Sequence, residues 1–571
     1  MNQPRPSYHR FLPPLLVIAL YVSALAFTNA HYMADSGGYV VSILAYAGVE
    51  EYVAENPVVA DYRSENSYWD FGHLLWRPLG LLLYSVFTPV SSLVVGPDPG
   101  YNARILLMWV NYLAGLLSAV LLYALIDRLT GRRWLGVLVS VLFIFSNGFL
   151  NFAQGASSYV AGLACVVVAL YLLLKDKGRP SSLAAIGAGL ACTAAVSVWA
   201  LYILVVPGII LAPLVLFGPG GTVKASIVRA SASFVIASAI AFGVVMAAAG
   251  VNTPSEVLEF IAASSHGIHT SGLARMVFGF PRSFIHMGND GILFKRFLLN
   301  DPFNPVSAMD LVRLSLWKLA LFYLASAAVV IGLLVSRSWR MLVWLAIAAL
   351  PLLLFAIKFD GGAIERYIPI YPAIFIALAW VLNDPKLPRL LKIVPVVFFG
   401  FAVLVNATVM ARAVLNRQKQ TTETRISAVI PQLNLNSWVV TSHLQDDLVN
   451  FQISFPFEPV NYRSYHIYPL LVLNSDQIQT WREEFAQRML EAWDKGGDAW
   501  ISTRMFHPKP EASWNWVEGD DPRVRWEHLH AFFTQFDTGP VAGGADGFVR
   551  LEKSEKNRQL LNAARSRAGS H

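Results

Sequence analysis

Residues 11–46, FLPPLLVIALYVSALAFTNAHYMADSGGYVVSILAY, join an apolar run of membrane-spanning length to a single acid, Asp35. About 18 or more apolar residues can cross a hydrocarbon core of about 30 Å as a helix. The basic, polar residues before this run favour a cytoplasmic amino terminus, so the helix would deliver Asp35 to the outer membrane surface. Position alone also allows a simpler interpretation, in which Asp35 caps the helix that follows.

The composition is that of a membrane protein. Of the 571 residues, 55% are hydrophobic and 14% are charged. Further apolar runs follow the first, so we predict a polytopic α-helical membrane protein with about eleven transmembrane helices. No small-residue cleavage site precedes Asp35, and we interpret the first run as a retained anchor. The expected spans are residues 11–28, 105–126, 134–149, 158–174, 182–198, 201–216, 227–249, 311–335, 341–357, 367–382 and 391–409.

Basic clusters orient these spans. The segments DRLTGRR, KDKGR, SRSWR and NDPKLPR each follow an expected span. All four fall on the cytoplasmic side if the amino terminus is inside and residues 72–90 lie on the outer surface without crossing. A crossing at residues 72–90 would turn every cluster outward. The net charge of +7 therefore reflects membrane orientation, and we expect no nucleic-acid partner.

After about residue 411 the composition changes to that of a soluble domain. The segments SWVVTSH, DAWISTRM and GFVRLEK predict short strands, and residues 475–495 predict a helix. An odd number of spans places this part outside. We therefore predict a transmembrane domain of residues 1–410, with large outer loops at 31–100 and 252–310, and a small extracytoplasmic α/β domain of residues 411–571.

Ionisable groups gather at the outer edge of the apolar slab. They lie at Asp35, on a surface helix with His73 and Arg77, in loop 252–310 and in segment 358–366. Charges at this depth are costly unless they face water, a partner or a ligand. Several cations beside a few carboxylates suit a phosphate-bearing lipid, because the arginine fork matches phosphate oxygens. The alternative is that each cation only reaches toward ordinary phospholipid.

Three motifs occur in a fixed order along the chain. An acid follows the first span, with Tyr39 on a helix behind it; GHLLWRPLG, residues 72–80, lies in the first outer loop; and ERYIPIYP, residues 365–372, enters a late span. In this order and sidedness the chain resembles the GT-C glycosyltransferases, in particular the mannosyltransferase and aminoarabinose transferase group. These are membrane enzymes that take a sugar from a polyprenyl-phosphate carrier on the outer side.

The resemblance implies roles for individual residues. Asp35 would be the general base that takes the proton of the acceptor hydroxyl during an inverting attack on the anomeric carbon. The leaving lipid phosphate needs cations more than a general acid, and Arg366 would supply one. Glu365 and Arg366 could instead form a local ion pair at a helix start. The other implied residues are Lys358, Arg275 and Arg282 for the donor phosphate, and Tyr39, His73, Glu365 and Tyr367 for substrate.

The resemblance also implies partners and a location. The donor would be a polyprenyl-phosphate-linked sugar, the acceptor a glycan, lipid or protein, and the location a bacterial inner membrane with membrane lipid around the spans. No cofactor is assigned, although a divalent metal ion could serve. Candidate metal ligands are Glu50, Glu51, Asp70, Glu256 and the pair His266 and His269.

Two other functions remain open. A lipid-linked polysaccharide polymerase or ligase of GT-C type would depend on the Arg- and His-bearing loop 252–310 and less on Asp35. A transporter of lipid-linked sugars would show internal repeats and polar residues near the middle of the membrane. The sequence shows no clear repeat, and most of its charges sit at the edges of the spans.

Overall fold

The computed structural model is mostly helical, and it describes the greater part of the chain. The described residues are 11–29, 36–48, 68–97, 99–177, 179–263, 272–287, 297, 305–359, 361–412, 429–434, 436–441, 463–466, 475–508, 522–543 and 547–566.

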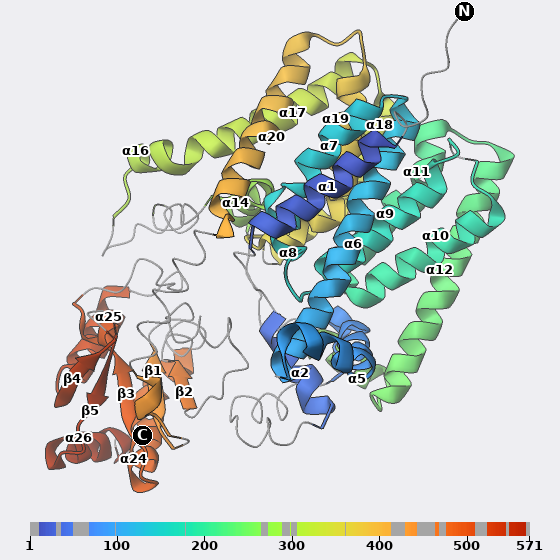
Figure 1. Cartoon of the computed structure of the whole chain (residues 1–571). Coiled ribbons are helices and arrows are strands. Elements are labelled where there is room, and N and C mark those ends of the chain that lie inside the picture. Colours follow the sequence, from blue (N-terminus) through green and yellow to red (C-terminus); the bar gives the residue numbers. More distant parts are fainter. Residues whose placement is uncertain are drawn as a thin grey trace, which may run out of the picture.

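The described residues as far as 412 lie mostly in apolar helices (Figure 1). In order they are α1 (Leu12–Phe27), α2 (Ser36–Tyr46), η2 (Phe71–His73), α5 (Trp76–Val95), α6 (Pro99–Thr130), α7 (Arg133–Ile144), α8 (Asn147–Phe152), α9 (Tyr159–Leu174), α10 (Ser182–Val198), η3 (Ala200–Leu204), α11 (Val206–Phe217), α12 (Gly221–Ala248), α13 (Pro254–Ala263), α14 (Leu273–Phe284), α16 (Ala308–Leu311), η4 (Val312–Leu316), α17 (Trp317–Val335), α18 (Trp339–Lys358), η5 (Ile364–Ile370), α19 (Tyr371–Asn383) and α20 (Arg389–Val409).

Within the described residues, eight helical stretches are long and apolar enough to cross a membrane, and the shorter helices α1, α7, α9 and α10 are also apolar. The chain is therefore a multi-pass integral membrane protein. Each span expected from the sequence overlaps one of these helices. Helix α5 meets the same criteria of length and composition, so its placement on the outer surface, and with it the count of about eleven spans, stays a prediction.

Small residues let the helices approach one another closely. A Cβ at Gly189 in α10 would clash with the backbone of α12 at Ala230, and one at Gly208 in α11 would lie 2.7 Å from the Ala348 side chain in α18. Close backbone approach of this kind is how helices associate where lipid removes the usual hydrophobic drive. Figure 1 shows α1, α6 and α7 packed together, with α9 against α6 and with α2 and α5 beside one end of α6.

The carboxy-terminal part contains a five-stranded sheet of order β2-β1-β3-β5-β4. Strand β1 is parallel to both β2 and β3, while β5 is antiparallel to β3 and β4. The elements are β1 (Trp438–Thr441), β2 (Arg463–His466), α24 (Ser475–Asp494), β3 (Ala499–Ser502), η7 (Thr503–Phe506), α25 (Pro522–Phe533), β4 (Thr538–Ala542), β5 (Phe548–Leu551) and α26 (Glu555–Ser566). Strands β1, β3 and β5 and helix α24 lie where the sequence predicted them.

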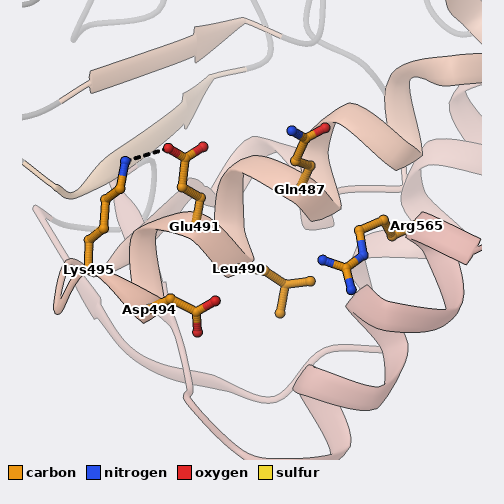
Figure 2. A pocket seen from close by; sticks show the side chains of 6 residues that line it. All are labelled: Gln487, Leu490, Glu491, Asp494, Lys495 and Arg565. Carbon is orange, nitrogen blue, oxygen red and sulfur yellow. Dashed lines mark hydrogen bonds and ion pairs between the residues drawn. The ribbon is translucent and has the colours of Figure 1, made fainter.

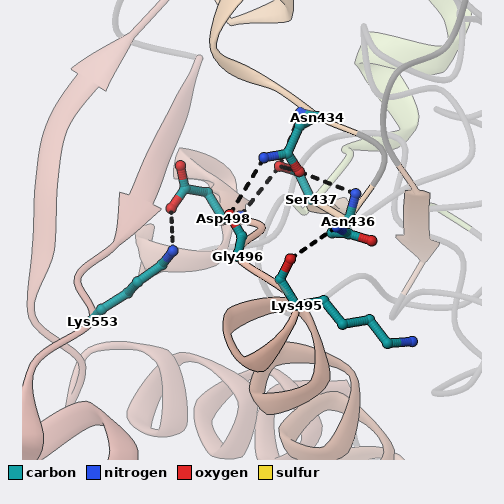
Figure 3. Close-up of polar contacts among 7 residues, drawn as sticks. All are labelled: Asn434, Asn436, Ser437, Lys495, Gly496, Asp498 and Lys553. Atoms are coloured by element: carbon teal, nitrogen blue, oxygen red, sulfur yellow. Dashed lines mark hydrogen bonds and ion pairs between the residues drawn. The ribbon is translucent and has the colours of Figure 1, made fainter.

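Polar contacts fix the start of β1 to the end of α24 (Figure 3). The Ser437 hydroxyl donates to Asn434 Oδ1 at 3.0 Å and accepts from the Asp498 backbone N–H at 3.2 Å. The Asn436 amide donates to the Lys495 carbonyl at 2.9 Å, and Lys553 Nζ lies 3.1 Å from the Asp498 carboxylate. These groups therefore set where the first strand enters the sheet.

Candidate active site

Helix α2 begins at Ser36, the residue after Asp35. Asp35 itself lies outside the described residues, and the structure places the helix that follows it. The Ser36 hydroxyl is buried and accepts a hydrogen bond of 3.0 Å from the Ala156 backbone N–H. Tyr39 and Ile43 on the same helix are buried in a cluster with Trp76 of α5. The amino end of α2 is therefore held by packing and by a hydrogen bond.

Tyr39 and His73, both predicted to bind substrate, lie against each other. Their ring centroids are 5.3 Å apart in an edge-to-face arrangement, and His73 Nδ1 lies 2.8 Å from the Ser158 hydroxyl. The Arg77 guanidinium stands 6.0 Å from the centroid of the Tyr39 ring. Arg77 also pairs with Asp70 at 3.7 Å, and both side chains are buried.

Asp70 was a candidate metal ligand, and the structure shows what its carboxylate contacts. It faces Arg77 and accepts the Gly72 backbone N–H at 2.9 Å, which caps η2. The Asp70 cap on η2 and the Asp70–Arg77 ion pair together hold His73, the last residue of η2, in place.

Arg366 lies in η5, at the start of a predicted span. Pro369, inside η5, has no N–H to donate, which favours a short irregular helix before α19. The guanidinium stands over two rings, 4.9 Å from the centroid of Phe359 and 5.9 Å from that of Trp199. Aromatic faces attract cations, so these rings hold Arg366 without neutralising its charge.

A series of rings connects α2 to Arg366. Beyond Tyr39 and His73, the His73 ring lies 6.2 Å from Tyr159, and the Tyr159 ring lies 4.6 Å from Trp199. Trp199 then faces Arg366. Helix η2 also packs against η3, and η3 packs against η5. The amino end of α2 and Arg366 therefore belong to one region of the fold, although 330 positions (366 − 36) separate Ser36 from Arg366 in sequence.

The other predicted cations lie around η5. Helix α14 packs against η5. It also lies so close to the turn before η5 that a Cβ at Gly279 would clash with the Gly361 carbonyl. This helix carries the half-buried Arg282. The Gly272 backbone N–H donates to the Ile357 carbonyl at 2.7 Å, and so brings the start of α14 to the end of α18. The exposed Arg275 and Lys358 follow that junction on the two helices.

Glu365 and Tyr367 differ in exposure. Glu365 is half-buried, whereas Tyr367 is fully buried and donates its hydroxyl to the Gly361 carbonyl at 2.5 Å. Tyr367 therefore packs the turn that precedes η5, and its role toward substrate stays a prediction.

Glu256, another candidate metal ligand, caps a helix. Its carboxylate accepts the backbone N–H groups of Asn252 at 2.6 Å and Thr253 at 3.1 Å, just before α13. These hydrogen bonds lower the pKa of the Glu256 carboxyl because they favour its charged form. In the part of the chain that the structure describes, no three His, Cys, Asp or Glu side chains form a metal-binding group. The remaining candidate ligands, Glu50, Glu51, His266 and His269, lie outside that part.

The sequence interpretation missed the connection between α8 and α9, residues 153–158. It gave no role to this AQGASS segment, yet every residue of it is buried. Ser158 contacts His73, and Ala156 contacts Ser36. Polar residues between two strongly apolar runs were the available signal. Trp199, which links the two sides of the site, lies between the expected spans 182–198 and 201–216 and was not predicted to belong to the site.

A cavity of about 280 Å³ lies elsewhere, between α24 and α26 of the carboxy-terminal part (Figure 2). Lys495 and Glu491 on its rim pair with each other at 2.5 Å. The lining residues are Gln487, Leu490, Glu491, Asp494, Lys495 and Arg565. None of the residues implied by the GT-C resemblance lies in it.

No protein-family model and no curated protein sequence matches the chain. Among solved structures, it is similar to ArnT from Cupriavidus metallidurans bound to undecaprenyl phosphate, with 11% identity over 96% of this chain and 98% of that chain and a TM-score of 0.48. It is also similar to the Archaeoglobus fulgidus oligosaccharyltransferase, with 14% identity over 90% of this chain and 70% of that chain and a TM-score of 0.41. It is similar as well to the arabinofuranosyltransferase AftD from mycobacteria, with 12% identity over 94% of this chain and 38% of that chain and a TM-score of 0.42.

All three are GT-C glycosyltransferases, the class that the sequence motifs resemble. At identities of 11–14% and TM-scores below 0.5, these similarities establish neither a common fold nor a common activity. Function is therefore inferred below from the residues of the site.

Proposed function

We propose that this protein is a membrane glycosyltransferase that moves a sugar from a polyprenyl-phosphate carrier to an acceptor hydroxyl, with inversion, at the outer surface of a bacterial inner membrane. The observation that supports this most is the ring series from α2 to Arg366. It relates the helix that follows Asp35 to a cation held on aromatic faces. ArnT, one of the structurally similar enzymes, was solved with undecaprenyl phosphate, and we propose a carrier of this kind here.

In this mechanism Asp35 is the general base. The acceptor hydroxyl gives its proton to the carboxylate while the acceptor oxygen bonds to the anomeric carbon. The bond from that carbon to the phosphate oxygen breaks, and its electron pair leaves with the lipid phosphate. Asp35 and the departing phosphate must then lie on opposite sides of the reacting carbon, which explains why base and cation come from different elements.

Arg366 stabilises the charge that develops on the phosphate. Its guanidinium is fixed on Phe359 and Trp199, so little reorganisation is needed during the reaction. The half-buried Arg282 on α14 is a second donor to the phosphate. Arg275 and Lys358 are exposed at the junction of α14 and α18. We propose that their positive charges attract the anionic donor toward the site.

Turnover of the Asp35→Asn variant tests the proposal. The assay follows release of undecaprenyl phosphate from a panel of undecaprenyl-phosphate-linked pentoses and hexoses by the full-length protein in detergent, with glycan, lipid and protein acceptors supplied to take the sugar. Loss of a positioned general base lowers kcat by about 10²- to 10⁴-fold. Asp127→Asn, a substitution in α6 at the expected cytoplasmic end of a span, is the matched control and should keep wild-type turnover.

Two results would contradict the proposal. If Asp35→Asn keeps most of its activity, Asp35 is not the base, and a polymerase or ligase that depends on loop 252–310 is favoured instead. If the wild-type protein consumes no member of the panel but moves an intact lipid-linked sugar across a vesicle membrane, the protein is a transporter.

A further inference from the structure

The buried loop 153–158 is held from two helices. Asn111 of α6 donates its side-chain amide to the carbonyls of Gly155 and Ser157, at 2.8 and 2.6 Å. The Trp76 indole N–H of α5 donates to the Ala156 carbonyl at 3.0 Å. Backbone carbonyls that would otherwise be unsatisfied in the interior thus fix the loop's conformation.

This loop bonds to both ends of the segment that contains Asp35. The Gln154 amide donates to the Thr28 hydroxyl at 2.9 Å, and Thr28 is the residue at which α1 ends. Two positions further on, the Ala156 N–H donates to the hydroxyl of Ser36, the first residue of α2. Thr28 and Ser36 flank residues 29–35, so one rigid loop contacts the chain immediately before and immediately after that segment.

The Thr28 end is fixed from a second side as well. Thr28 forms a β-bridge with Ala411, and the Asn29 N–H donates to the Met410 carbonyl at 2.8 Å. These contacts come from the end of α20 and leave the Thr28 hydroxyl available to Gln154. Gln154 is therefore the contact that couples the anchored end of α1 to the loop.

We propose that loop 153–158 is a clamp that sets the position of the Asp35 carboxylate, with Gln154 and Ser36 as positioning residues. The inference rests on the proposed role of Asp35 as general base. A base must lie within hydrogen-bond reach of the acceptor hydroxyl, and displacement by about 1 Å can cost about a hundredfold in rate. The clamp holds that position from both ends without touching substrate.

The clamp is separable from the stability of the fold. Tyr21 anchors α1 in the large apolar cluster, and Tyr39 and Ile43 anchor α2 in its own cluster. In a Gln154→Met variant the Thr28 hydroxyl still donates to the Ala24 carbonyl, at 2.6 Å in the structure, so that hydroxyl keeps a partner. Methionine also matches the length of glutamine. This substitution removes the bond to Thr28, and with it the Gln154 bond to the Leu150 carbonyl of α8 at 3.0 Å, and leaves the apolar packing in place.

The test measures release of undecaprenyl phosphate from the donor panel by full-length variants. Gln154→Met should lower kcat about ten- to a hundredfold and leave the KM for the donor unchanged, because the donor phosphate binds at Arg366. Thr28→Val removes the Gln154–Thr28 hydrogen bond by removing its acceptor, and it should lower kcat by the same factor. Ser42→Ala is the control, since among the described residues the Ser42 hydroxyl bonds within α2, to the Gly38 carbonyl at 2.9 Å.

A double-mutant cycle with Asp35→Asn separates positioning from a structural role. If Gln154 acts through Asp35, then Gln154→Met causes no further loss in the Asp35→Asn background. The same fold-loss in both backgrounds, or wild-type kcat for Gln154→Met alone, would overturn the clamp while the base assignment stands. Wild-type activity of Asp35→Asn alone would overturn the base assignment, and with it the reason for a clamp.

Discussion

Asn406 in α20 and Asn557 in α26 are both fully buried, and each makes three hydrogen bonds to backbone groups. The Asn406 side chain joins the Phe145 and Phe284 carbonyls and the His286 N–H, all at 2.7–2.8 Å. Those groups lie more than a hundred positions from it in sequence. Asn406 thus fixes the ends of separate apolar helices next to α14 and η5.

Asn557 performs the equivalent task locally. Its side chain bonds both backbone groups of Asp537, at 2.7 and 2.9 Å, and the Glu552 carbonyl at 2.8 Å. It therefore ties α26 to the turns beside β4 and β5. The helical part uses its buried amides to join distant segments around the candidate site, whereas the sheet part uses one to close a neighbouring turn.

The ion pairs of the helical part and of the sheet part also differ, in how deeply they are buried. In the helical part, Arg77 and Asp70 pair while almost fully buried beside the site. In the sheet part, pairs such as Lys556 with Asp537 lie on the surface, where an ion pair contributes little to stability. Buried charge is costly, so it is kept where it positions other groups. The comparison is consistent with the proposal that the helical part carries the chemistry.

The largest effect expected is that of Gly279→Ala, which breaks the contact between α14 and η5. The new methyl group would overlap the Gly361 carbonyl, and backbone cannot move aside as a side-chain end can. We expect a loss of about 3 kcal/mol or more in the free energy of unfolding. Thermal unfolding in detergent measures this loss.

Gly362→Ala is the matched control, because a Cβ there meets no atom within 4 Å. Equal melting temperatures for the two variants would show that α14 does not rest on the turn before η5. The packing of α14, which carries Arg282, against η5, which carries Arg366, would then fail as well.

A smaller effect is expected when each buried asparagine becomes leucine. Asn406→Leu should cost about 2–3 kcal/mol, because three backbone groups lose their partner where water has poor access. Asn557→Leu should cost about 1–2 kcal/mol, since the nearby surface lets water replace the lost bonds. Thermal unfolding of the two variants compares them directly. If Asn557→Leu lost more free energy of unfolding than Asn406→Leu, the contrast between a long-range amide in the helical part and a local one in the sheet part would be contradicted.

Much of the helical part is predictable from the sequence because spanning length and apolar composition are local properties. Residues 341–357 were expected to span, and α18 covers Trp339–Lys358. The helix after Asp35 and the late ERYIPIYP entry were also foreseen. Helix α5 shows the limit of this reasoning, since hydropathy alone does not distinguish a surface helix from a span.

The contacts of the site could not be predicted in the same way. The resemblance named Tyr39, His73 and Arg366, but not the Trp199 ring that lies between His73 and Arg366. The clamp was invisible because a sequence does not show which carbonyl a buried amide bonds. Asn111 looks like an isolated polar residue in an apolar run, and Gln154 looks like part of a polar connection, until the fold brings the loop and Thr28 to them.

A structure of the full-length protein with undecaprenyl phosphate bound tests the central claim most directly. The account predicts that the phosphate lies within hydrogen-bond distance of the Arg366 guanidinium, on the side of Trp199 that faces His73 and α2, with the Asp35 carboxylate open to the space beside it. A phosphate bound away from Arg366, or packed protein between Arg366 and Asp35, would contradict it.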